Sequence, residues 1–228
     1  MLTLYTAIGY LKFEKKENGK PLPIIINNGQ EYGVSDQELL LWSCLAFQIL
    51  QIHELKAEYD SRFAKTTLPE ALPFSHYLNR LLLRGLIAKG EGLTGVDALY
   101  RLLGTLYILP VKDTFPVRFF SCIHLCLEGK LKAGDFSRYL KKEPRSPIEE
   151  VILKLAEKAP LSTAEMLTSI EKQADIQNEA DVMKELYEDS DATYQSLADD
   201  AQLHHIQFPV LQAVGNLYLN KQISFQTF

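Results

Sequence analysis

Hydrophobic positions recur at strand spacing near the N-terminus and at helical spacing along most of the remaining chain. Residues 4–13 and 22–26 are rich in β-forming side chains, and the Asn18-Gly19 pair between them is a hairpin turn signal. We therefore expect a β-hairpin over residues 2–28. The rest of the chain predicts helices with a few short strands, so the expected fold class is mainly α with short β elements (α+β).

The first helical stretch has a clear beginning. Ser35 and Glu38 form a capping box, in which each side chain satisfies a backbone N–H that the helix start leaves free. The apolar positions that follow continue to about Glu58 and occupy much of the circumference, which predicts one long core helix. Pro69 and Pro73 cannot lie inside a regular helix, so the residues around them are expected to form a connector.

The chain from Ser75 onward predicts a helix, a stop, a strand and a turn in close succession. Ser75 is a suitable N-cap, and the apolar residues after it follow helical spacing. Gly85 ends this helix, because glycine tolerates the left-handed backbone found just past a helix end. Residues 86–88 then suit a short buried strand, and the Gly-Glu-Gly sequence at 90–92 suits a turn.

A further helix is expected before a domain boundary. Thr94 and Asp97 are typical of a helix N-terminus, and this helix is predicted to reach about Tyr107 and to end before Pro110. The boundary is expected at residues 110–116. The predicted division is an N-terminal hairpin, a central domain and a helical C-terminal domain, over residues 1–34, 35–112 and 113–228.

Polar residues form one stripe on the helix that starts at Ser75. His76, Arg80 and Arg84 are four residues apart, and Asn79 lies beside them. Asn and Arg side chains pair with adenine and guanine edges, and Lys89 near the expected turn is placed to reach a backbone phosphate. Both arginines are expected on an exposed face where alanine is tolerated. The alternative is an ordinary solvated helix face.

The order of a basic-faced helix, a glycine stop, a strand and a glycine-rich turn resembles the end of a winged helix-turn-helix. Over about residues 35–110 the chain is similar to bacterial winged-helix regulators. The resemblance implies that the helix over residues 75–84 enters the DNA major groove, that the turn at 90–92 touches the DNA backbone, and that the protein forms a homodimer.

The C-terminal region is expected to be helical. Helices are predicted at 116–127 and 133–142, and capping boxes at Ser146 and Ser162 begin two more. A last helix opened by Pro209 leads into a strand. Its helix, short turn and strand repeat the order seen after Ser75, which is consistent with a second winged-helix-like unit. A helical domain that merely ends in a strand explains the pattern as well.

Charge limits the function classes. The chain has 228 residues, 46% of them hydrophobic, and a net charge of −5, so it has no global positive field that attracts nucleic acid. Residues 130–145 are basic, whereas residues 174–200 are acidic with Lys184 as the single base. The acidic run is expected to be a solvated connector or a site for a basic partner.

Candidate chemistry is sparse. Cys122, His124 and Cys126 are spaced so that a helix would direct the histidine away from the thiols, which favours a core helix over a metal site. With Cys44 the number of cysteines is odd, so reduced thiols are expected. No phosphate-binding loop, nucleophile elbow or zinc-protease motif is present. No apolar run reaches the roughly 18 residues of a membrane span, so a cytoplasmic location is expected.

These observations predict a non-catalytic DNA-binding protein without cofactor or metal, acting in transcriptional control. Its expected DNA-binding residues are His76, Asn79, Arg80, Arg84 and Lys89. The alternative hypothesis is a winged-helix-type protein-interaction or assembly module that does not bind DNA. An enzyme with an unrecognised site ranks third.

Overall fold

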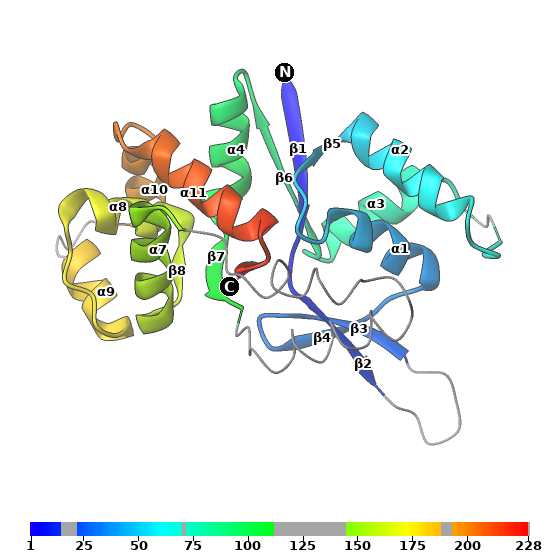
Figure 1. Cartoon of the computed structure of the whole chain (residues 1–228), viewed down its shortest axis with the longest axis horizontal. Helices are drawn as coiled ribbons and strands as arrows, with labels where there is room; N and C mark the ends of the chain where they lie inside the picture. Colours follow the sequence, from blue (N-terminus) through cyan, green and yellow to red (C-terminus); the bar gives the residue numbers. More distant parts are fainter. Residues whose placement is uncertain (15–21, 70–71, 112–144, 188–192, 228) are drawn as a thin grey trace, which may run out of the picture.

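The computed structural model describes residues 1–14, 22–69, 72–111, 145–187 and 193–227 (Figure 1). These residues form helices and short antiparallel strands, so the expectation of helices with short β elements is confirmed at this level. The predicted helices at 116–127 and 133–142, the residues Cys122, His124 and Cys126, and the basic residues 130–142 lie outside the described residues. None of the described helices is long and apolar enough to cross a membrane.

The N-terminal hairpin differs from the prediction at its first strand. Strands β2 (Tyr10–Glu14) and β3 (Leu22–Asn27) pair as expected, and β4 (Gln30–Gly33) adds a third strand. The residues before Gly9, however, form a separate strand, β1 (Leu2–Ala7), in a different sheet. Gly9 allows the break because its φ is +82° and a Cβ there would overlap the carbonyl of Ile26.

The predicted long core helix is two helices. Helix α1 (Asp36–Leu45) begins with the expected Ser35–Glu38 capping box, and α2 (Ile52–Phe63) follows the short strand β5 (Leu50–Gln51). Phe47 has a φ of +58° between them, which no helix accommodates. The Glu54 carboxylate accepts the N–H of Gln51 at 2.8 Å, so a second cap already present in the sequence marks the restart.

Helix α3 (Phe74–Leu83) starts two residues earlier than predicted, with Pro73 rather than Ser75 at its N-cap. Its end is as predicted: Gly85 has a φ of +66°. The N–H of Gly85 donates to Leu82 and that of Leu86 donates to Leu81, which closes the last turn.

The predicted turn at residues 90–92 is wrong. These residues belong to strand β6 (Ile87–Gly92), which pairs antiparallel with β1 so that Leu2 faces Gly92. The glycines serve packing: a Cβ at Gly90 would overlap the backbone of Leu102, and one at Gly92 would overlap Ala98. Helix α4 (Gly95–Leu103) therefore lies directly on this strand.

The expected helix from Thr94 begins as predicted but ends earlier. Thr94 Oγ1 accepts the N–H of Asp97 at 3.1 Å, whereas Tyr107 and Pro110 belong to strand β7 (Tyr107–Pro110). Strand β7 pairs with two strands of the second half of the chain, at residues 161–162 and 223–226. The chain therefore enters the second sheet before Pro110, not after it.

The second half contains the predicted caps at Ser146 and Ser162. The acidic run is not simply a connector, because it contains two helices with buried apolar residues. The last helix starts two residues before Pro209. The elements here are α7 (Pro147–Lys158), β8 (Leu161–Ser162), α8 (Thr163–Lys172), α9 (Glu179–Leu186), α10 (Tyr194–Ala201), α11 (Gln207–Leu219) and β9 (Ile223–Gln226).

The two halves share one order of elements. In the first half, α1, β5, α2, α3 and β6 follow one another, and β1 lies between β5 and β6. In the second half, α7, β8, α8, α11 and β9 occur in the same order, with α9 and α10 between α8 and α11, and β7 lies between β8 and β9. In both halves the central strand lies earlier in the chain than the first helix.

The halves meet at the phenol of Tyr218 on α11. Its oxygen accepts the N–H of Phe47 and the hydroxyl of Thr6, each at 3.0 Å, and lies 3.2 Å from the carbonyl of Leu45 and 3.3 Å from that of Ala7. Burial raises the pKa of Tyr218, so the phenol keeps its proton and donates to one of these carbonyls. One side chain of the second half thus satisfies backbone groups of the first.

The C-terminal strand also contacts the N-terminal segment. The N–H of Gly9 donates to the carbonyl of Phe225 at 2.8 Å. The buried Asn27 side chain donates to the carbonyl of Gly85 and to the hydroxyl of Thr227, and accepts the N–H of Thr227. Residues from both ends of the chain and from the end of α3 are therefore held together.

Replacing Tyr218 with Phe should lower the free energy of unfolding by about 1–3 kcal/mol, because the Phe47 N–H is left buried without an acceptor. Tyr5→Phe is the matched control, since no described residue is hydrogen-bonded to its hydroxyl, and it should change stability by less than about 0.5 kcal/mol. Urea denaturation measures both. Equal effects of the two substitutions would contradict the role assigned to the Tyr218 hydroxyl.

Candidate functional site

The polar face of α3 is partly as predicted. Tyr77, Leu78 and Leu81 are buried against α1 and the sheet, and this orientation exposes His76, Asn79 and Arg80 together on the opposite face. Leu83 lies on the same exposed side, with 88% of its surface accessible. The face therefore combines hydrogen-bonding groups with one apolar side chain.

Arg84 is not a free surface residue. Its Nη2 donates to the carbonyl of Gly33 at 2.6 Å, its guanidinium lies 5.6 Å from the centroid of the Tyr32 ring, and its Nη1 is 3.5 Å from Glu38 Oε1. Its side chain is 26% exposed. These contacts tie the end of α3 to β4 and to the start of α1, so Arg84 does not lie on a freely exposed face as predicted, and we expect alanine at this position to lower stability.

Glu38 is the shared partner of both arginines. Its side chain is only 2% exposed, and Oε1 lies 3.2 Å from Arg80 Nε and 3.5 Å from Arg84 Nη1. Its other oxygen accepts the N–H of Ser35 at 2.8 Å as part of the capping box. Arg80 remains 49% exposed. A buried carboxylate therefore partly neutralises the basic part of this face.

Lys89 lies apart from the helix stripe. It is exposed on β6, where it faces Tyr5 of β1, and its Nζ is 3.3 Å from the Glu91 carboxylate. The structure therefore brings His76, Asn79 and Arg80 onto one surface, uses Arg84 to hold that surface in place, and pairs Lys89 with an acid on its own strand.

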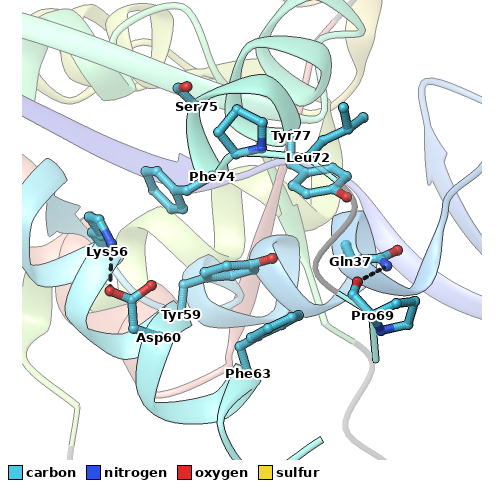
Figure 2. Close-up of a pocket in the computed structure, with 11 residues that line it drawn as sticks. Gln37, Lys56, Tyr59, Asp60, Phe63, Pro69, Leu72, Phe74, Ser75 and Tyr77 are labelled. Atoms are coloured by element: carbon cyan, nitrogen blue, oxygen red, sulfur yellow. Dashed lines mark hydrogen bonds and ion pairs between the residues drawn. The ribbon is translucent and has the colours of Figure 1, made fainter. Parts of the chain in front are cut away.

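Sequence reasoning missed an aromatic pocket of about 370 Å³ between α2 and the start of α3. Tyr59 contacts the rings of Phe63 and Phe74, with centroids 5.7 and 5.4 Å apart. Lys56 Nζ lies 5.9 Å from the Phe74 centroid and 2.5 Å from Asp60. Figure 2 shows these side chains around the hollow, with Gln37 and Pro69 at the other side. The pocket has the volume of a small-ligand site and room for one flat apolar group. No local sequence motif predicts this pocket, because its aromatic rings come from two separate helices.

The described residues contain no cluster of three or more histidines, cysteines or acids that would hold a metal ion. Within them Cys44 is a free thiol buried on α1, and burial raises its pKa to about 11. It is therefore protonated at neutral pH and a poor nucleophile.

Comparison of the chain with protein-family models, curated proteins and solved structures gave no match. Function is therefore inferred from the side chains and the order of elements.

The two arginines should differ in their effect on stability. Arg84→Ala removes a hydrogen bond and a ring contact and leaves Glu38 with one cation, so we expect a loss of about 2–3 kcal/mol. Arg80→Ala removes one half-exposed ion pair and should cost less than about 1 kcal/mol. Urea denaturation of both variants tests this, and an equal loss would show that Arg84 does not hold β4 to α3.

Proposed function

We propose that this chain is a non-catalytic, winged-helix-like DNA-binding protein that acts in transcriptional control. In this proposal α1, α2 and α3 are the three helices of the unit, and β5, β1 and β6 are its sheet. Helix α3 enters the major groove. His76, Asn79 and Arg80 then face base edges and phosphates, and Leu83 is placed for apolar contact with thymine methyl groups.

The observation that supports the proposal best is the exposed stripe of α3 in this order of elements. A winged helix usually has a hairpin after the recognition helix, and here the second strand of that hairpin is replaced by β1. Because Leu2 faces Gly92, β1 starts where β6 ends. The two strands of the wing are therefore paired but not joined by a hairpin loop. The contact between residues 90–92 and the DNA backbone that the sequence predicted is not part of the proposal.

A second candidate function is a protein-interaction module that uses the same fold. The ion pairs of Arg80 and Arg84 with Glu38 and of Lys89 with Glu91 favour it, because they reduce the positive charge available to phosphates. The exposed Leu83 is equally suited to an apolar protein contact. The two candidates differ in their dependence on salt.

Binding to random duplex DNA should weaken steeply as salt rises, since each phosphate contact releases counterions. Arg80→Ala should lower the slope of log affinity against log salt by about one. Lys184→Ala is the matched control: it removes one cation from α9, on the opposite side of the molecule from α3 (Figure 1), and should leave the slope unchanged. Fluorescence anisotropy measures this, and an absence of binding at low salt would favour the protein-interaction module.

Glu38→Gln should strengthen DNA binding and steepen its salt dependence. Glutamine can still accept the Ser35 N–H at this position of a capping box, so the helix start is kept. The charge that neutralises Arg80 and Arg84 is removed. Circular dichroism checks the fold, and anisotropy measures affinity. A folded Glu38→Gln variant with unchanged or weaker binding would show that Arg80 does not face DNA.

A further inference from the structure

Helix α11 is the counterpart of α3 in the second half of the chain. In α3 the N–H of Leu86 donates to Leu81 after the left-handed Gly85, and in α11 the N–H of Gln222 donates to Leu217 after the left-handed Lys221. A strand follows each turn and pairs with the central strand of its sheet. The same backbone pattern therefore fixes which positions of the two helices correspond.

This correspondence places three amides where α3 carries its polar stripe. Counting back from the matched turns, Gln212, Asn216 and Asn220 occupy the positions of His76, Arg80 and Arg84. All three are exposed, and Leu219, at the position of Leu83, is 46% exposed. On the other side of α11, Val214, Leu217 and Tyr218 are buried. Both halves thus direct the same helix face outward.

The amides of this face are available. Within the part of the chain that the structure describes, the side chains of Gln212, Asn216 and Asn220 have no hydrogen-bond partner. The contrast with α3 is direct, since both arginines there are held by Glu38. Glu149 is the corresponding capping-box residue in the second half, and no described residue forms an ion pair with it.

Two cations lie at the C-terminal end of this face. The chain has no acidic residue from 201 to its end. Lys221 is exposed directly after Asn220, and Arg145 is held beside it because its Nε donates to Gln222 Oε1 at 2.6 Å. Two cations therefore flank the C-terminal end of a stripe that is itself uncharged. Cations at the edge fit phosphates, and amides at the centre fit base edges.

We infer that α11 is a second DNA-reading helix, in which Gln212 and Asn216 contact adenine edges in the major groove. The inference rests on the proposed function of α3. Asn and Gln pair with adenine through N6 and N7. Because the two helices carry different side chains, one chain recognises a site made of two different blocks, one of which contains adenine. A symmetric homodimer of single-helix readers would instead select a palindrome.

Selection of duplexes from a random-sequence pool by the full chain tests this. We expect a two-block, non-palindromic site bound by one chain, as measured by sedimentation. Gln212→Ala/Asn216→Ala should lose preference at the adenine-containing block and bind roughly 10- to 100-fold more weakly. His76→Ala/Asn79→Ala should lose the other block. Gln195→Ala, an exposed glutamine on α10, is the control and should change neither.

A modified duplex separates base contact from lost stability. Replacing the block's adenines with 7-deazaadenine removes the N7 acceptor. This change should weaken DNA binding by the parent protein and leave DNA binding by Gln212→Ala/Asn216→Ala unchanged. A folded Gln212→Ala/Asn216→Ala variant that keeps the parent's site and affinity would overturn the role of α11 and leave that of α3 intact. An absence of binding by the parent protein would overturn the proposed function itself, and with it this inference.

Discussion

The pairing of β1 with β6 is the constraint on which the rest of the structure depends. It brings the first residues of the chain against residues that follow α3, and it completes a sheet that β5 and β6 cannot form alone. The glycines of β6 let α4 lie directly on that pair. From the end of β1, Thr6 and Ala7 reach the phenol of Tyr218. One long-range strand pairing therefore positions both the first unit and its contact with the second.

The buried carboxylate of Glu38 has two roles. A capping-box glutamate ordinarily satisfies one backbone N–H, but this one also holds two arginines of a different helix. Because Glu38 is buried, we expect these ion pairs to contribute more to stability than a pair on the solvated surface would. The same carboxylate therefore links α1 to α3 and lowers the charge that α3 presents.

The repeated order of elements gives the two halves matching outward faces with different chemistry. The arginines of the α3 face form ion pairs with Glu38, whereas the uncharged amides of the α11 face have no hydrogen-bond partner among the described residues. A chain with a net charge of −5 exerts no long-range attraction on nucleic acid, so the proposed DNA binding would depend on short-range contacts for affinity. Two separate helix faces in one chain would supply more of those contacts than one face alone.

The sequence by itself determined the local features. The capping boxes at Ser35, Ser146 and Ser162 and the stop at Gly85 are where the patterns predicted them. Helical spacing also identified the exposed stripe of α3. These features involve residues within a few positions of one another, so their energetics are written in short stretches of sequence.

Only the tertiary structure decided the rest. The break at Phe47, the separation of β1 from β2, and the strand in place of a turn at residues 90–92 all depend on partners far along the chain. The same holds for Arg84, whose partners on β4 and α1 no spacing rule connects to it. Strand pairing and buried ion pairs are chosen by which surfaces meet, and local periodicity does not carry that information.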